Sequence, residues 1–190
     1  MSRPWQAYTD KQLADYAKTG SNEAYREFLR RYKPSIYRLI SSQIGDPDEA
    51  LDLTQEAFVS AFSAISRYDG ERPFRVWMAR IAINKCRDWA RRRKVRAFFS
   101  AALPLDLAFN VKCPAPLPDE AAEMPREANR VRDAIAKLPD NLREVLVLRA
   151  VEEMSQAEVA MLLKVSEKTV ETRLYRARLK LREILGPAQD

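Results

Sequence analysis

The sequence predicts an all-α protein made of two small helical domains joined by a flexible linker. Apolar residues recur at steps of three and four, and no stretch shows the alternation typical of strands. Only four glycines interrupt the 190 residues, whereas five of the eleven prolines fall between residues 97 and 125. We therefore expect an N-terminal helical domain over residues 1–96, a linker over residues 97–125 and a C-terminal domain over residues 126–190.

The N-terminal domain should contain four amphipathic helices. Each has an apolar stripe that repeats every three or four residues, and the expected ranges are 9–19, 23–44, 48–65 and 77–96. Pro34 falls inside the second helix and should kink or split it, because proline lacks the backbone N–H. Asp46 and Pro47 suit the cap and the first position of the third helix.

The C-terminal domain carries the pattern of a helix-turn-helix. Ser155 and Glu158 form a capping box, residues 164–166 form a short turn, and Ser166 caps a long final helix. In proteins with this motif the second helix enters the DNA major groove by its N-terminal half. That half offers polar side chains suited to base edges or phosphates, namely Glu167, Lys168, Thr169, Glu171, Thr172, Arg173 and Arg176.

The fourth predicted helix is strongly basic. Residues 80–96 hold eight basic side chains and one acid, in a chain whose net charge is +6. Trp77 lies one turn before a basic face made of Arg80, Asn84, Arg87 and Arg91. A flat aromatic ring beside basic groups is typical of surfaces that hold unstacked bases of single-stranded DNA. The alternative is an ordinary solvated helix end.

The composition argues against an enzyme. The chain has no histidine, its four glycines are isolated, and Cys86 and Cys113 are far apart. These residues cannot build a histidine-based triad, a phosphate-binding glycine loop, a metal site or a disulfide framework. We expect Cys86 to be buried, and we expect no cofactor and no small-molecule substrate. The sequence shows no signal peptide and no apolar run as long as a membrane span, which predicts a cytoplasmic protein.

The order of these motifs resembles that of the extracytoplasmic-function (ECF) sigma factors, which are subunits of RNA polymerase. The resemblance rests on residues 52–58, 67–74 and 77–84 in the first domain and on residues 138–149 and 165–178 in the second. It covers nearly the whole chain outside the linker. It implies an alternative sigma factor that binds core RNA polymerase and directs promoter recognition, DNA melting and transcription initiation.

The resemblance also implies roles for three groups of residues. Asp52, Gln55 and Glu56 would bind the clamp helices of the polymerase β′ subunit. A second group would capture a flipped base of the −10 promoter element and hold the melting strand: Tyr68, Asp69, Gly70, Arg72, Phe74, Trp77, Arg80, Asn84 and Lys85. A third group would read or clamp the −35 element: Arg149, Lys168, Thr169, Thr172, Arg173 and Arg176. Further implied partners are the β flap of the polymerase and an anti-sigma factor, and the linker would pass near the RNA exit path.

Two features depart from the family pattern. Glu171 stands where many members carry a basic residue, so the −35 sequence preference does not transfer. Residues 71–73 of the loop are particular to this chain, which leaves the captured base open. The alternative function is a stand-alone helix-turn-helix regulator that binds duplex DNA as a dimer without polymerase. Such a regulator has no need of the basic, aromatic helix in the first domain.

Overall fold

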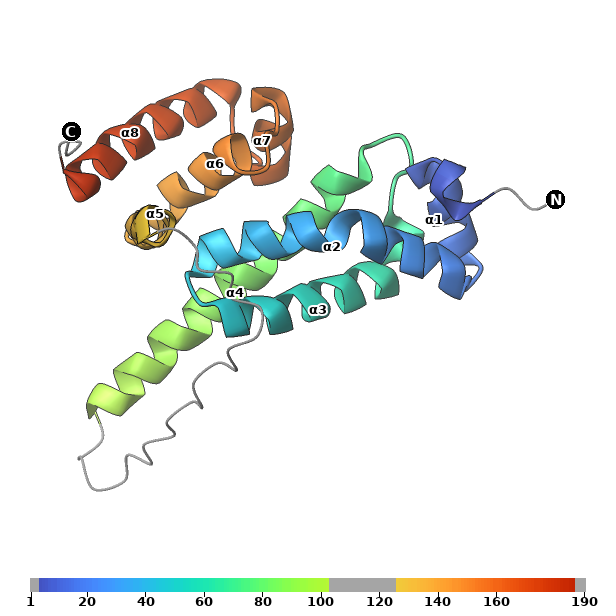
Figure 1. Ribbon diagram of the computed structural model, residues 1–190, viewed down its shortest axis with the longest axis horizontal. Helices are drawn as coiled ribbons and strands as arrows, with labels where there is room; N and C mark the ends of the chain where they lie inside the picture. Colours follow the sequence, from blue (N-terminus) through green and yellow to red (C-terminus); the bar gives the residue numbers. More distant parts are fainter. Residues whose placement is uncertain (1–3, 103–125, 187–190) are drawn as a thin grey trace.

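The computed structural model describes residues 4–102 and 126–186, and within these residues all regular secondary structure is helical, as predicted (Figure 1). In chain order the helices are η1 (Trp5–Ala7), α1 (Asp10–Lys18), α2 (Asn22–Ile44), α3 (Pro47–Ser63), η2 (Ile65–Arg67), α4 (Phe74–Ala102), α5 (Arg126–Ala136), α6 (Asp140–Ala150), α7 (Gln156–Leu163) and α8 (Glu167–Leu185). The elements up to α4 form the N-terminal domain, and α5 to α8 form the C-terminal domain. Most of the predicted linker, residues 103–125, lies outside the described residues.

The helix starts depend on the predicted capping side chains. Ser155 and Glu158 form a reciprocal capping box: the Ser155 hydroxyl accepts from the Glu158 N–H at 3.2 Å, and the Glu158 carboxylate accepts from the Ser155 N–H at 2.7 Å. Asp46 caps α3 and Ser166 caps α8 in the same way, through a side-chain oxygen. Each cap satisfies an N–H that the first turn of a helix leaves unpaired.

Helix α2 continues through Pro34, so the expectation that proline splits it is wrong. The proline forfeits one backbone hydrogen bond. Buried side chains on both sides of it, Phe28 before and Ile36 and Leu39 after, all belong to the domain core. Both halves of α2 therefore gain by staying in register against α3 and α4, and this packing outweighs the local loss.

Helix α4 is longer than the sequence pattern predicted. It begins at Phe74 and reaches Ala102, beyond the expected end at Arg96 and into the predicted linker. The added residues are alanines, phenylalanines and one serine, with no proline before Pro104. Alanine has the highest helix propensity, so this segment favours continuation of the helix. The last helix of the first domain thus extends into the segment assigned to the linker.

Aromatic rings fill the core of the N-terminal domain at the junction of α2 and α4. The rings of Phe28 and Phe74 are fully buried and stack with centroids 4.0 Å apart. Farther along α4, Cys86 faces inward, as predicted, and Trp89 is buried beside it. Burial raises the pKa of the Cys86 thiol to about 12, so this cysteine is a small apolar residue of the core.

The two domains pack directly against each other. Helices α5 and α6 contact α2, and α7 contacts α4 (Figure 1). One buried apolar cluster runs through both domains: Val145 and Met154 of the C-terminal domain belong to the same cluster as Phe28 and Phe74. This contact was not predicted, because the sequence indicated two domains joined by a flexible linker.

Candidate nucleic-acid and polymerase interfaces

The three predicted polymerase-binding residues share the exposed face of α3. Asp52, Gln55 and Glu56 point outward because the opposite face of the helix, with Leu53 and Ala57, is buried in the core. The Glu56 carboxylate lies 3.3 Å from the ammonium group of Lys85 on α4. The structure therefore brings these residues together as one polar surface.

Two apolar side chains on the same helix were missed by the sequence analysis. Leu51 is 43% exposed and Val59 is 65% exposed, although both are aliphatic. Each lies outside the buried stripe of α3. Both could have been found in the sequence as aliphatic residues outside the apolar stripe. Exposed apolar groups on a charged helix mark contact surfaces.

An open groove of about 520 Å³ lies beside this surface, between α2 and α3. Its apolar side is formed by Leu29 and Phe58, and Gln55 belongs to its lining. Its basic side chains are Arg26, Arg30 and Lys33. The groove can hold an apolar side chain while the basic groups attract nearby carboxylates.

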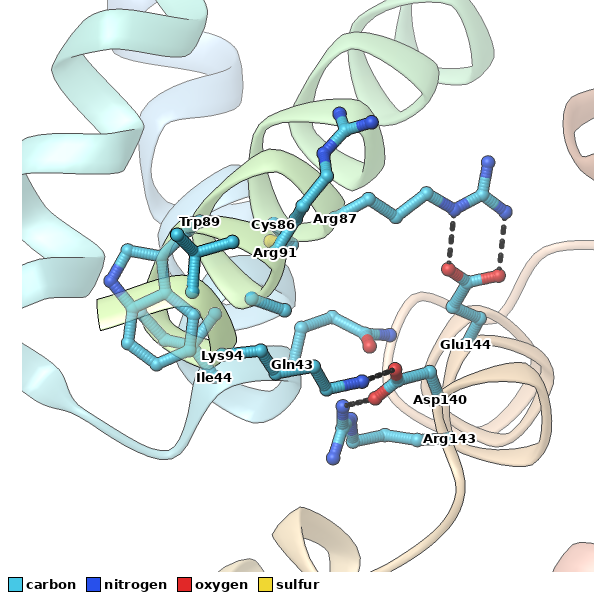
Figure 2. Close-up of a pocket in the computed structure, with 12 residues that line it drawn as sticks. Gln43, Ile44, Cys86, Arg87, Trp89, Arg91, Lys94, Asp140, Arg143 and Glu144 are labelled. Carbon is cyan, nitrogen blue, oxygen red and sulfur yellow. Dashed lines mark hydrogen bonds and ion pairs between the residues drawn. The ribbon is translucent and has the colours of Figure 1, made fainter. Parts of the chain in front are cut away.

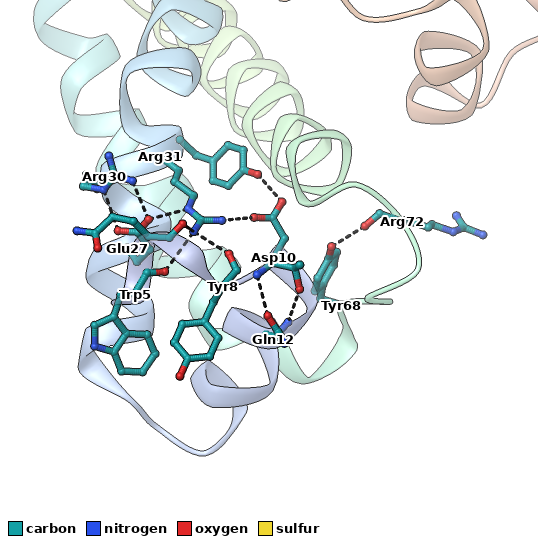
Figure 3. A network of polar contacts seen from close by, with 12 residues as sticks. Trp5, Tyr8, Asp10, Gln12, Glu27, Arg30, Arg31, Tyr68 and Arg72 are labelled. Carbon is teal, nitrogen blue, oxygen red and sulfur yellow. Dashed lines mark hydrogen bonds and ion pairs between the residues drawn. The ribbon is translucent and has the colours of Figure 1, made fainter. Parts of the chain in front are cut away.

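A polar network joins α2 to the N-terminal segment (Figure 3). The guanidinium of Arg31 donates to Glu27 at 2.7 Å, to Asp10 at 3.1 Å and to three backbone carbonyls of residues 5–8. Glu27 is 4% exposed and also accepts two hydrogen bonds from Arg30. The hydrogen bonds from Arg30, the largest contribution, and from Arg31 outweigh burial and lower the pKa of Glu27 to about 2.

The structure places two of the predicted −10 contacts in the core. Phe74 is fully buried and Tyr68 is 4% exposed, with the Tyr68 ring edge-on to Phe74 at 5.3 Å between centroids. The Tyr68 hydroxyl donates to the backbone carbonyl of Arg72 (Figure 3), and burial raises the pKa of that hydroxyl to about 12. These rings hold the shape of the loop and are not available to touch a base in this conformation. The Phe74 ring is buried because stacking on Phe28 removes more of its apolar surface from water than a position in the exposed loop would.

The rest of the loop is exposed or half-exposed. Asp69 and Arg72 form a surface ion pair at 3.3 Å. A Cβ added to Gly70 would stand 3.0 Å from Cγ of Lys11 on α1, so this glycine permits a close approach between the loop and the first helix. Asp69, Gly70 and Arg72 therefore remain together at the open edge of the N-terminal domain.

The predicted residues of α4 divide between two faces. Trp77 is half-buried and contacts Tyr68, with centroids 5.2 Å apart. Asn84 is exposed, whereas Arg80 is partly covered and donates to the backbone carbonyl of Met161 on α7 at 3.4 Å. Lys85 turns the other way, toward Glu56 on α3. Lys85 is therefore separated from the face that carries Arg80 and Asn84.

Five of the six predicted −35 contacts gather on the N-terminal half of α8. Lys168 and Arg176 are exposed, and Thr169, Thr172 and Arg173 are half-exposed. The sixth, Arg149, lies on α6, and its guanidinium donates to the backbone carbonyl of Met154, so it supports the connection to α7. The sequence analysis missed Tyr175, which is 64% exposed on α8. An aromatic residue outside the apolar stripe of α8 is the sequence signal that could have indicated an exposed ring at this position.

Ion pairs join the basic face of α4 to the C-terminal domain (Figure 2). Arg87 donates from Nε and Nη2 to the two carboxylate oxygens of Glu144 at 2.6 and 2.7 Å. Lys94 lies 3.4 Å from the carboxylate of Asp140. A cavity of about 320 Å³ lies beside these pairs, and its lining includes residues of α2, α4 and α6.

The described residues offer no metal site and no membrane span. Across residues 4–102 and 126–186, no group of three or more histidine, cysteine, aspartate or glutamate side chains could hold a metal ion. None of the helices in that part of the chain is both long enough and apolar enough to cross a bilayer.

Comparison with protein families defines the class. The family model described as Sigma-70 region 2 matches residues 28–96, which contain α3, the loop and most of α4. The model described as Sigma-70, region 4 matches residues 128–181, which contain the helix-turn-helix. The chain is thus a sigma-70-type transcription initiation factor with regions 2 and 4.

Comparison with individual proteins narrows the class. The RNA polymerase sigma factor CnrH of Cupriavidus metallidurans is 38% identical over 180 residues, which cover 93% of this chain and 94% of the relative. The ECF sigma factor SigW of Bacillus subtilis is 32% identical and covers 92% of this chain and 96% of its own length. The chain belongs to the ECF RNA polymerase sigma factors. A solved structure of CnrH in complex with the cytosolic domain of CnrY is similar, with a TM-score of 0.66 and 32% identity over 93% of this chain and 96% of that one.

Proposed function

We propose that this chain is an alternative sigma factor that carries out promoter recognition and melting as a non-enzymatic subunit of RNA polymerase. The observation that carries the proposal is the presence of both sigma-70 regions in one chain that matches its relatives over more than nine-tenths of their length. The factor would change no covalent bond. Core polymerase would position its two DNA-binding surfaces, and binding to promoter DNA would offset the cost of unpairing bases.

The exposed face of α3 would dock on core polymerase. Asp52, Gln55 and Glu56 are exposed together on this helix, and the basic-rimmed groove between α2 and α3 lies beside them. The proposed contact is with the β′ clamp helices. Leu51 and Val59 would add apolar area, since both aliphatic side chains are exposed on the same helix.

The loop and α4 would hold the −10 element. Asp69, Gly70, Arg72 and Asn84 lie on accessible surface, and we assign capture of a flipped base to this group. Arg80 and the half-buried Trp77 would hold the melting strand. Tyr68 and Phe74 would act indirectly by fixing the loop, because both rings are buried. Lys85 would contribute through Glu56 and the docking face.

The first half of α8 would read the −35 element in the major groove. This assignment rests on the helix-turn-helix geometry of α7 and α8 and on the polar side chains at the start of α8. Arg173 and Arg176 can pair with guanine edges or phosphates, and Thr169 and Thr172 with base edges. Arg149 would set the angle between α6 and α7. The β flap is the polymerase partner proposed for this domain.

An anti-sigma factor is the proposed regulator, and the proposed compartment is the cytoplasm. Support comes from the relative CnrH, whose solved structure contains the cytosolic domain of CnrY. The exposed groove between α2 and α3 is suited to a partner helix with apolar and acidic side chains. Such a partner would cover the surface that docks on polymerase.

The testing experiment is a pull-down of the purified chain with core RNA polymerase. The triple variant Asp52→Ala/Gln55→Ala/Glu56→Ala should lose binding, whereas Asp15→Ala, on the exposed surface of α1, should retain it. Retention of polymerase by the triple variant would contradict the docking assignment. Absence of polymerase binding by the wild type, with dimeric binding to duplex DNA, would instead favour the stand-alone regulator.

A further inference from the structure

We propose that α1 holds the loop of residues 67–74 in the conformation that captures a base, and that Lys11 is the positioning residue through which it does so. The inference rests on the proposed function of the loop. It gives a task to Glu71, which lies among the proposed base contacts without being one of them. Lys11 acts through the loop and does not itself touch DNA.

The tip of the loop is a turn closed by Asp69. The backbone N–H of Arg72 donates to the carbonyl of Asp69 at 3.1 Å, and the N–H of Glu71 donates to the Asp69 carboxylate, also at 3.1 Å. A turn in which an aspartate side chain accepts from the backbone two residues on keeps its own shape. The buried rings of Tyr68 and Phe74 anchor the two ends of the loop. The direction in which the tip projects has to be set by another contact.

Helix α1 makes the contact that sets this direction. The Lys11 ammonium forms an ion pair with the carboxylate of Glu71. The aliphatic part of the same side chain lies against the loop backbone, since a Cβ added to Gly70 would stand 3.0 Å from Cγ of Lys11 and 3.6 Å from its Cβ and Cδ. Helix α1 also contacts η2, the short helix that leads into the loop. Lys11 therefore holds the tip of the loop both by charge and by the packing of its stem.

The same contact explains why a glycine stands in this turn. Gly70 does not have the positive φ of Gly20, Gly45 and Gly186, so its backbone conformation is also open to other residues. The glycine provides room instead, because a side chain at this position would place its Cβ against the stem of Lys11. The residue type at position 70 thus matches a lysine that is distant in the sequence.

Lys11 is suited to a positioning role because the start of α1 is itself held in place. The neighbouring Asp10 accepts from the guanidinium of Arg31 on α2 at 3.1 Å (Figure 3). Thr9 and Gln12 form a reciprocal capping box, with the Thr9 N–H donating to the Gln12 side chain at 3.0 Å and the Gln12 N–H to the Thr9 hydroxyl at 3.3 Å. Lys11 therefore extends toward the loop from a fixed turn of helix.

The contact lies at the surface, so it acts on the population of loop conformations more than on the stability of the domain. The side chains of Lys11 and Glu71 are 59% and 76% exposed. An ion pair this exposed shifts an equilibrium by a factor of up to about five, and the packing of the lysine stem adds to that. Loss of the contact lowers the fraction of chains whose loop is ready for a base. The apparent affinity for the base falls by the same fraction.

The first measurement is the hydrogen-exchange protection of the Glu71 and Arg72 amides in the full chain. Lys11→Met keeps most of the stem and should lower the protection factors about threefold, whereas Lys11→Ala removes stem and charge and should lower them about tenfold. Lys18→Met, at an exposed lysine of α1 whose partner Asp15 lies on the same helix, is the matched control and should leave them unchanged. The charge reversal Lys11→Glu/Glu71→Lys should restore protection. Unchanged protection in Lys11→Ala would overturn the proposal.

The second measurement asks whether the contact serves base capture. The complex of the wild-type chain with core polymerase selects a single-stranded oligonucleotide from a random pool, and removal of each base in turn finds the position that matters most for affinity. Lys11→Ala should raise the Kd for the intact oligonucleotide about tenfold and leave the Kd for the one lacking that base unchanged. An equal rise for both would overturn the positioning role. A wild type that does not bind polymerase, or binds without any base that matters, refutes the proposed function, and hydrogen exchange still decides whether Lys11 holds the loop.

Discussion

At the scale of single residues, Glu27 links the N-terminal segment to the polymerase-facing groove. Its carboxylate accepts from both Arg30 and Arg31, and Arg31 in turn holds Asp10 and the backbone before α1. Arg30 also belongs to the lining of the groove between α2 and α3. A single buried acid therefore affects both the stability of the domain and the position of a basic group on a binding surface.

Replacement of this acid should reduce stability in a pH-dependent way. We expect Glu27→Gln to lower the free energy of unfolding at pH 7 by roughly 2 kcal/mol, because charge-assisted hydrogen bonds become weaker. The folded-state pKa of Glu27, about 2, lies below the ordinary value of 4.5 for a glutamate. The contribution is therefore complete above pH 4.5 and is lost as the pH falls toward 2. Urea unfolding of wild type and variant at several pH values measures this, and Asp15→Asn on exposed α1 is the control. A constant difference down to pH 2 would argue against the assignment.

Phe74 shows a burial that residue-level prediction from the sequence did not foresee. Its position next to an exposed loop suggested contact with a base, whereas its ring stacks on Phe28 in the core. A phenylalanine beside a loop can face either solvent or the core, with the same neighbours in the sequence. Here the contact with Phe28 of α2 places the ring in the core, and the local sequence does not reveal that contact. Cys86 was predicted correctly because its place on the apolar stripe of α4 depends on local periodicity alone.

The burial of Phe74 leads to a distinct expectation for its variants. Phe74→Ala should destabilise the fold by about 3–5 kcal/mol, the cost of removing a large ring from a packed core. Chemical denaturation followed by circular dichroism measures this change. A variant of normal stability with a selective defect in promoter melting would instead return Phe74 to the group of direct DNA contacts. Leu51→Ala, on exposed surface, should have little effect on stability.

At the scale of elements, helix positions followed from the sequence because their causes are local. Capping boxes and apolar stripes lie within a few residues of the helix they define, as in Ser155 and Glu158. The end of α4 was missed because the cluster of prolines was taken to begin the linker. The helix continues through residues 97–102, three of which are alanines. Whether α2 continues through Pro34 depended on its packing against α3 and α4, and the sequence of α2 alone does not reveal that packing.

The recognition helix α8 provides the element-scale prediction. Arg173→Ala should weaken binding of duplex DNA that carries the −35 element by roughly 1–3 kcal/mol, the value of one good base contact. Polymerase binding should remain, because the assigned docking face is on α3. Fluorescence anisotropy with the assembled polymerase measures duplex binding, and Arg178→Ala, farther along α8 and exposed, is the comparison. Loss of polymerase binding by Arg173→Ala would disprove the division of roles.

At the scale of the whole molecule, the contact between domains could not be predicted from the sequence. Arg87 and Glu144 are separated by 57 positions, and Arg75 and Glu158 by 83. No local pattern connects residues at such separations, and a flexible linker would permit many arrangements. The two DNA-binding surfaces could be predicted from local motifs, whereas the contact of α6 and α7 with the basic face of α4 could not.

The shared apolar cluster predicts cooperative unfolding of the two domains. Val145 and Met154 are buried in one cluster with Phe28 of the N-terminal domain, so calorimetry of the wild type should give a single thermal transition. Glu144→Lys, which removes the strongest cross-domain pair, should separate this transition into two. Glu153→Lys should keep one transition. Two transitions in the wild type would mean that the domains are not energetically coupled.

The protonated thiol of Cys86 bears on how this factor can receive signals. Oxidants and electrophiles attack thiolates, and a pKa of about 12 leaves almost none of this cysteine in that form at physiological pH. Its side chain is also almost inaccessible to solvent. Oxidants therefore do not react readily with Cys86, and a redox stimulus would have to act on this factor through another group.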